Sequence, residues 1–321
     1  MPPIAERATD FSAIPVLDLS RDAETLAPEL HRAATEVGFF YLKGHGVARS
    51  VIDSMFAAAH EFFALPLEDK QRMKVDDRHR GFLRVGEAKM HRGAKPDLKE
   101  SYLYGNDLPE SDPDVQAGRP LMGPNRWPVG LPSMKLAADA YYTGIHQCGL
   151  QLLRVFARAL DLPADYFTPF YDKPLTRGSL LYYPPQPPAM GPDQYGVSAH
   201  SDYGAITFVA QDATGGLEVL NRSGQWIPAA PDPACFVVNI GDLMARWTND
   251  RYVSTPHRVV NRSGRARFSL ATFFDPHPDT AIAAIPSCVD PGQKPLYPAT
   301  TCGEHVLSRF SAAFAYRQKA S

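Results

Sequence analysis

The stretch from residue 178 to residue 274 constrains the fold most, because it alternates short apolar runs with turn residues. The runs are GSLLYYP, AITFVAQD, GLEVL, QWIPAA, CFVVNIGD, HRVVN and RFSLATFF, and Gly, Pro, Asn and Asp recur between them. Short β-rich runs broken by turn residues in this way are typical of strands. Many short strands at this spacing predict a β-sandwich, a jelly roll or a barrel.

Helical patterns precede these strands. Apolar residues recur at spacings of three and four over 22–37 and again over 52–63, which predicts two amphipathic helices. A long helix is predicted from about residue 132 to residue 160. We therefore expect an α+β fold, mainly β, in which helices surround a double-stranded jelly-roll core. The mixed region 1–130, with a variable substrate-side segment, and the long helix with the core, 131–321, are expected to form one compact unit.

Composition argues against several classes of protein. The 321 residues carry 33 basic and 35 acidic side chains, a formal net charge of −2, and no basic run marks a nucleic-acid-binding surface. No apolar run is long enough to span a bilayer. The four cysteines lack C-x-x-C spacing, and the N-terminus does not resemble a signal peptide. We expect a cytoplasmic protein with reduced thiols, either a monomer or a weak homo-oligomer, that binds neither nucleic acid nor membrane.

A histidine and an aspartate stand two residues apart in SAHSDYGAITF. On a strand, His200 and Asp202 would point to the same face, where buried polar groups are costly without partners. His257 begins another β-prone run, far enough along the chain for the strands between to return beside the first. Two imidazoles and one carboxylate on adjacent strands make the facial triad of non-haem Fe(II), whereas structural zinc sites use four ligands and usually cysteine.

The H-x-D spacing alone is a weak signal, since an exposed polar pair would look the same. A second pair strengthens it, because Arg267 and Ser269 share one face of the apolar run RFSLATFF. An arginine fork beside a hydroxyl is a carboxylate receptor. A surface ion pair is the alternative, but a buried arginine needs an anionic partner. A metal with open positions next to this receptor suits a 2-oxo diacid, which chelates the iron through its keto-acid end and leaves a position for O2.

Segments along nearly the whole chain resemble those of one enzyme family. They are IPVLDLS, GFFYLKGHGV, FFALPLEDK, LLYYPPQP, HSDYGAITFVAQD, GLEVLNRSGQWIPAAP, FVVNIGDLMARWTND, RYVSTPHRVVN, RFSLATFFDP and YPATTCGEHVLSRF. In them the chain resembles the Fe(II)- and 2-oxoglutarate-dependent oxygenases of the isopenicillin N synthase-like group, which includes flavonoid- and gibberellin-modifying plant enzymes. The resemblance implies a distorted jelly roll with His200, Asp202 and His257 as iron ligands. It makes Arg267 and Ser269 the receptor for the distal carboxylate of 2-oxoglutarate.

The resemblance assigns further residues around the iron. Tyr183 matches the tyrosine that hydrogen-bonds the same carboxylate, and Phe273 matches a position that packs near the substrate. Leu181 stands where plant members often have Asn, which removes one polar contact beside the co-substrate. The substrate pocket is expected between the β core and the variable N-terminal segment. Core packing is the alternative for each of its candidate linings, which are Met90, Tyr102, Tyr104, Trp247 and Phe273.

The function implied is that of a 2-oxoglutarate-dependent dioxygenase, which uses Fe(II) and O2 and is stimulated by ascorbate. Such an enzyme hydroxylates or desaturates a small organic molecule and releases succinate and CO2. Two alternatives stay open. The first is an oxidase like isopenicillin N synthase itself, which uses O2 without 2-oxoglutarate and binds a substrate carboxylate at the Arg-x-Ser pair. The second is a non-enzymatic jelly-roll binding protein with a vestigial metal site. The sequence does not specify the prime substrate.

Overall fold

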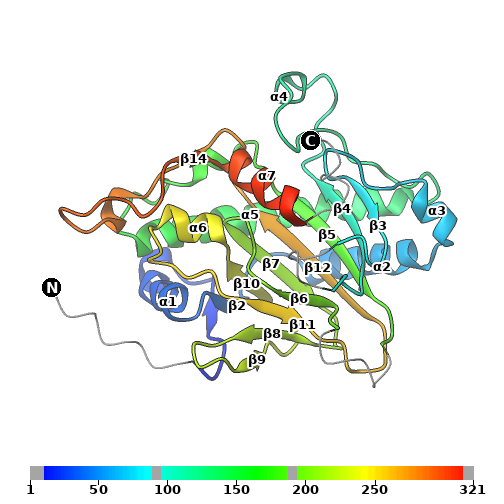
Figure 1. Ribbon diagram of the computed structural model, residues 1–321, viewed down its shortest axis with the longest axis horizontal. Helices are drawn as coiled ribbons and strands as arrows, with labels where there is room; N and C mark the ends of the chain where they lie inside the picture. The colour runs from blue at the N-terminus through cyan, green and yellow to red at the C-terminus, as the bar shows by residue number, and fades with distance from the viewer. Residues whose placement is uncertain (1–10, 89–94, 187–193, 314–321) are drawn as a thin grey trace.

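The computed structural model describes residues 11–88, 95–186 and 194–313, and its largest element is an eight-stranded sheet (Figure 1). The first pair of strands runs parallel and the other neighbours run antiparallel. In spatial order the strands are β1 (Val16–Asp18), β2 (Phe39–Lys43), β10 (Phe236–Ile240), β7 (Ile206–Gln211), β12 (Arg267–Phe274), β5 (Arg177–Tyr183), β4 (Glu100–Gly105) and β3 (Gly81–Leu83).

A second, four-stranded antiparallel sheet supplies the other layer of the core. Tyr183 and Val237 of the large sheet share a small apolar cluster with Leu217, Val219 and Val259 of this one, so the two sheets pack face to face. A short third sheet pairs two further strands. In spatial order the strands of the second sheet are β6 (Val197–His200), β11 (His257–Val259), β8 (Leu217–Leu220) and β9 (Trp226–Pro228), and those of the third are β13 (Ala281–Ile282) and β14 (Thr300–Thr301).

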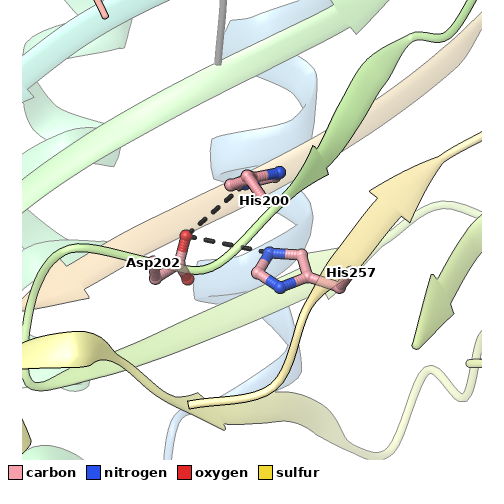
Figure 2. A group of neighbouring side chains, drawn as sticks. All are labelled: His200, Asp202 and His257. Carbon is pink, nitrogen blue, oxygen red and sulfur yellow. Dashed lines mark ion pairs between the residues drawn. The ribbon is translucent and has the colours of Figure 1, made fainter. Parts of the chain in front are cut away.

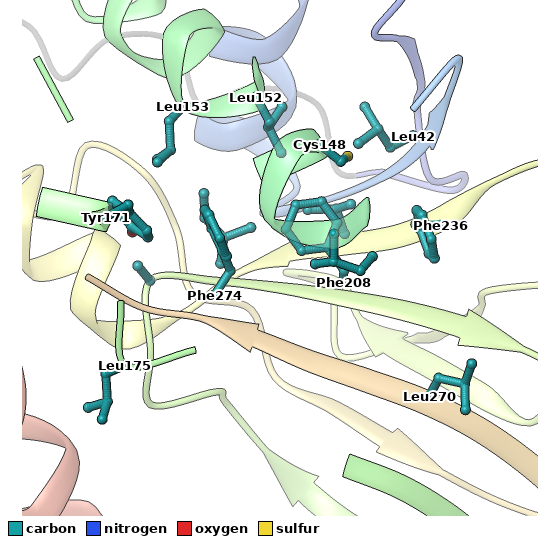
Figure 3. Packing of buried hydrophobic residues seen from close by; sticks show 14 of the residues in the cluster. Leu42, Cys148, Leu152, Leu153, Tyr171, Leu175, Phe208, Phe236, Leu270 and Phe274 are labelled. Atoms are coloured by element: carbon teal, nitrogen blue, oxygen red, sulfur yellow. The ribbon is translucent and has the colours of Figure 1, made fainter. Parts of the chain in front are cut away.

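Helices α1 (Ala23–Glu36), α2 (Arg49–Ala64) and α5 (Pro132–Ala159) pack on strands of the large sheet. The other helices are α3 (Leu67–Gln71), α4 (Pro113–Gln116), α6 (Asp242–Trp247) and α7 (Cys302–Ala313), with 3₁₀ turns η1 (Thr168–Tyr171) and η2 (Pro286–Cys288). Helix α5 contacts α1, α2 and β12. Figure 3 displays this core, in which Phe208 and Phe274 of the sheet lie beside Cys148 and Leu152 of α5. A Cβ on Gly149 would lie 2.4 Å from the ring of Phe274, so the glycine lets α5 approach the sheet closely.

Side chains of strand β12 point alternately to the two faces of the large sheet. Leu270 and Phe274 belong to the core beneath the helices. Arg267, Ser269 and Phe273 point the other way and line a cavity between the sheets. One face of β12 thus brings Arg267 and Ser269 into the interior of the jelly roll, while Leu270 and Phe274 on the other face anchor the strand to the helical layer.

The predicted α+β fold with a jelly-roll core is confirmed, and the helices predicted over 22–37, 52–63 and 132–160 correspond to α1, α2 and α5. One local expectation was wrong. Strand β6 ends at His200, so Asp202 lies in the loop beyond it and not on the strand itself. None of the helices in the described segments is long and apolar enough to cross a membrane.

Candidate metal centre and anion receptor

Three ligand-type side chains converge where β6 and β11 pair (Figure 2). His200 ends β6 and lies directly opposite His257, the first residue of β11. Asp202 reaches them from the loop after β6, and its Oδ1 is 3.7 Å from Nε2 of each histidine. The side chains are 16 %, 9 % and 7 % exposed for His200, His257 and Asp202, so the group is nearly enclosed. The pairing of adjacent strands, predicted from sequence, therefore brings the three residues together.

Backbone carbonyls determine which ring nitrogens are free to bind a metal. Nδ1 of His200 lies 2.8 Å from the carbonyl oxygen of Ser198, and Nδ1 of His257 lies 3.3 Å from that of Thr255. A carbonyl oxygen only accepts, so Nδ1 carries the proton in each ring and donates it. Nε2 is then the nitrogen of each ring on the side of Asp202 and the atom available to a metal. Contacts of this kind orient metal-binding histidines in proteins.

The electrostatics of the group match the protonation states of metal ligands. Burial, reinforced by the neighbouring His257, lowers the pKa of His200 to about 3, even though Asp202 opposes the shift. Burial raises the pKa of Asp202, but the two imidazoles and hydrogen bonds from Thr207 and Asn239 outweigh it, and the pKa lies below its usual value. At neutral pH His200 is therefore neutral and Asp202 ionised, as metal binding requires.

Asn239 supports the site from β10 and was missed by the sequence reasoning. Its Nδ2 donates a hydrogen bond of 2.7 Å to Oδ2 of Asp202, and it is 1 % exposed. The amide therefore holds one carboxylate oxygen, while Oδ1 faces the imidazoles. A signal was present in the sequence, because Asn239 interrupts the apolar run FVVNI, where an amide is costly without a partner.

Arg267 lies 1 % exposed on the inner face of β12. Its Nη1 donates to Oγ of Ser269 at 3.1 Å, its Nη2 to Oε1 of Gln211 at 3.0 Å and its Nε to the carbonyl of Gly215 at 2.6 Å. These acceptors, all from the described part of the chain, are neutral. A buried guanidinium whose acceptors are all neutral favours an anionic ligand. Gln211, at the end of β7, was not anticipated from the sequence.

The residues expected beside this receptor lie next to it. Tyr183 is opposite Arg267 in the β5–β12 ladder, and the guanidinium carbon lies 4.6 Å from the centre of its ring. Leu181 is opposite Ser269 and gives this wall of the cavity an apolar surface. All four line the same cavity as the triad. The metal-binding group and the anion receptor therefore open into one space between the sheets.

The candidate substrate-lining residues divide into two groups. Phe273 lines the cavity from β12. Strand β4 presents Ser101 and Leu103 to the cavity, and alternation turns Tyr102 and Tyr104 to the opposite face, where they are 0 % and 2 % exposed in the main core. The two tyrosines are therefore core residues, and the structure does not bring them to the cavity.

Two candidates remain to be placed. Trp247, at the end of α6, is 2 % exposed and packs edge-on against Phe167 at a ring separation of 5.1 Å. It belongs to the main core and is not among the described residues that line the cavity. Met90 lies outside the described residues. The sequence reasoning also missed two cations of the cavity wall, Arg177 and Lys99.

Two family models match the chain on either side of the long helix. Residues 14–130 match the model described as the N-terminal region of non-haem dioxygenases in morphine synthesis. Residues 178–276 match the model of the 2OG-Fe(II) oxygenase superfamily. The second range contains the triad and the arginine receptor.

Individual proteins resemble the chain over most of its length. The 2-oxoglutarate-Fe(II) type oxidoreductase hxnY of Emericella nidulans is 34% identical over 321 residues, which cover 98% of this chain and 92% of the relative. A 2OG-Fe(II) oxygenase family protein from Caulobacter crescentus superposes with a TM-score of 0.82 at 34% identity, over 94% of this chain and 99% of that one. JOX2, solved with 2OG, Fe and JA, gives a TM-score of 0.78 at 28% identity, over 92% and 84% of the two chains.

Proposed function

The chain belongs to the superfamily of 2-oxoglutarate- and Fe(II)-dependent oxygenases, and we propose that His200, Asp202 and His257 are the ligands of its iron. One observation carries this assignment. Oδ1 of Asp202 lies 3.7 Å from Nε2 of each histidine, and the three ligand atoms all lie within 4.8 Å of one another, which is the spacing around a single metal ion. Two imidazoles and one carboxylate on one side of a metal are the donor set of non-haem Fe(II), with positions left open for ligands.

Arg267, with Ser269 and Tyr183, is the proposed receptor for the distal carboxylate of 2-oxoglutarate. The buried guanidinium supports this role because its acceptors among the described residues are neutral. Ser269 adds a hydroxyl beside the fork, and the ring of Tyr183 covers one guanidinium face. The apolar surface of Leu181 keeps water from competing for the charge pair.

The enzyme is a 2-oxoglutarate-dependent dioxygenase, and its reaction is the hydroxylation or desaturation of a small organic molecule with release of succinate and CO2. Bound Fe(II) supplies the redox centre for O2 activation and for oxidative decarboxylation of the co-substrate. The chain's own residues orient the reactants. Asn239 fixes the carboxylate of Asp202, and Arg267 fixes the far end of 2-oxoglutarate. Relatives named as 2-oxoglutarate-dependent favour this reaction over an oxidase that dispenses with 2-oxoglutarate.

An anaerobic titration tests both assignments. Adding 2-oxoglutarate to the Fe(II) protein should produce a weak visible chelate band, and O2 should then yield succinate. His200→Ala and Asp202→Ala should lose the band and the turnover, whereas Arg267→Leu should need far more 2-oxoglutarate to form the band. His31→Ala is the matched control, because His31 contacts the carbonyl of Ala159 and does not line the cavity. Undiminished turnover in His200→Ala and Asp202→Ala would refute the iron assignment.

The domain organisation, location and assembly state of the protein are also proposals. We propose that 1–130 and 131–321 act as one unit, which is supported by the single large sheet, in which β1–β2 and β3–β4 flank the strands of the later range on its two edges. The four cysteines are free, which accords with the proposed cytoplasmic location. We further propose a monomer or a weak homo-oligomer that acts without nucleic acid or membrane. Light scattering of the purified holoenzyme across a concentration series tests the assembly state.

A further inference from the structure

The cavity has a second cationic end, away from Arg267. Arg177 begins β5 and pairs in the ladder with Phe273, whereas Arg267 pairs with Tyr183 at the other end of the same two strands. Phe273 lies six residues along β12 from Arg267, which is roughly 20 Å of strand. Both arginines line the cavity. If 2-oxoglutarate occupies the Arg267 end, Arg177 lies at the end left for the prime substrate.

The ion pair of Arg177 uses one edge of its guanidinium. The residue is 4 % exposed, and its Nη2 donates to Oδ2 of Asp275. The other oxygen of Asp275, Oδ1, accepts a hydrogen bond of 2.6 Å from the backbone N–H of Ala205. Asp275 thus engages the guanidinium through Nη2 alone, and Nε of Arg177 has no hydrogen-bond partner among the described residues. A guanidinium engaged in this way retains donors for a second oxygen acceptor.

Aromatic rings hold the guanidinium in place. Its central carbon lies 5.2 Å from the ring centre of Phe273 and 4.9 Å from that of Phe310. Both rings line the cavity, together with Leu83 and Leu103. The end of the cavity near Arg177 therefore combines one fixed cation with apolar walls, which is the composition expected of a site for a small amphipathic molecule.

The charges of the cavity wall point to an anion. Asp202 is the one carboxylate among the described lining residues, and the iron would neutralise it. Lys99 is a further cation of the wall, and its partner Asp97, at 3.2 Å, does not line the cavity. The acids that pair with Arg177 and Lys99 thus lie behind the wall, while the cations themselves form it. A substrate entering this space meets positive groups.

We propose that Arg177 binds a carboxylate of the prime substrate, so that the substrate is an organic acid with an apolar body. This proposal rests on the proposed function, because it takes the Arg267 end of the cavity as occupied by 2-oxoglutarate. The carboxylate accepts hydrogen bonds from the free edge of the guanidinium. The apolar body lies against Phe273, Phe310 and the two leucines, with part of it directed toward the iron.

Matched pairs of acids and amides test the charge requirement. Phenylacetate with phenylacetamide, and hexanoate with hexanamide, are titrated by calorimetry into the anaerobic Fe(II) enzyme saturated with 2-oxoglutarate. At least one acid should bind about tenfold or more tightly than its amide, which is the effect expected when a hydrogen-bonded charge is lost. Arg177→Gln should abolish this preference, and Arg177→Lys should retain part of it. Arg158→Gln, a surface variant on α5 that breaks an ion pair with Glu24, should keep it in full.

A second variant guards against a purely structural effect. Arg177→Gln leaves Asp275 buried without its cation, which can unfold the protein. The double variant Arg177→Gln/Asp275→Asn removes both charges and should fold while lacking the acid preference. Equal binding of acid and amide, a preference that survives in the double variant, or no binding of either acid overturns the assignment. If the same samples still form a normal chelate band with 2-oxoglutarate, the iron and co-substrate roles hold and only the role of Arg177 is refuted.

Discussion

Asn239 and Asp202 form a hydrogen bond of 2.7 Å that connects β10 to the loop after β6. The bond occupies Oδ2 and leaves Oδ1 directed at the two histidines. Asn239 is 1 % exposed, so solvent does not compete with it. The carboxylate is therefore held so that one oxygen is available to a metal, and the orientation of Asp202 depends on a residue outside the triad.

Replacing Asn239 should lower the affinity for Fe(II). Asn239→Leu keeps the side-chain size but removes the donor, and the affinity for Fe(II) should fall about 10- to 100-fold. Anaerobic titration of the metal-free protein with Fe(II) measures the effect directly. Asn221→Leu is the control, because Asn221 is a buried asparagine that bonds the backbone of Phe11 and does not line the cavity. Equal iron affinity in Asn239→Leu and Asn221→Leu would contradict this role.

Arg267 should be needed for its fork and not only for its charge. In Arg267→Lys the ammonium cannot reproduce the three donor directions to Ser269, Gln211 and Gly215. Loss of one charged hydrogen bond costs about 1.5–3 kcal/mol, so the KM for 2-oxoglutarate should rise by about 10- to 150-fold. Succinate formation against 2-oxoglutarate concentration gives the value. Arg258→Lys, at an ion pair with Glu218, should leave this KM unchanged.

The H-x-D pair and the Arg-x-Ser pair could be singled out from the sequence because each is a short spacing within a β-prone run, whereas His257 was added because it begins a separate run. The sequence did not predict the position of Asp202 beyond the end of β6, since strand ends depend on pairing with β11. It also could not tell which face of β4 is internal. In ESYLYG both faces carry an apolar side chain, so the pattern does not tell which face points into the cavity. Only the register of β4 with β5 places Tyr102 and Tyr104 in the core. Arg177 was missed because a lone arginine at a strand start gives no signal of burial.

Acid should destabilise the metal-free protein partly through His146. Burial lowers the pKa of His146 on α5 below its ordinary value of 6.5, and its Nδ1 has no partner among the described residues. The unfolded chain takes up this proton more readily, so stability is full above pH 6.5 and declines as pH falls through that value toward the lower folded pKa. His146→Phe should reduce the decline. Chemical denaturation at pH 8 and at stepwise lower pH, without metal, measures it, and identical pH slopes in the two proteins would contradict this account.

Tyr104 should behave as a core residue, and a glycine opposite it provides the test. A Cβ on Gly178 would lie 2.1 Å from the ring of Tyr104, because β5 approaches β4 at this point. Gly178→Ala should therefore destabilise the protein by about 1–3 kcal/mol through overpacking. Tyr104→Leu should cost stability alone but relieve the collision, so the double variant should be more stable than the sum of the single changes predicts. Because Tyr104 faces away from the cavity, Tyr104→Phe should leave the KM for 2-oxoglutarate and the affinity for Fe(II) unchanged. Additive stability effects in the double variant would contradict the contact between Gly178 and Tyr104. A shift in the KM of Tyr104→Phe would instead indicate that Tyr104 lines the cavity.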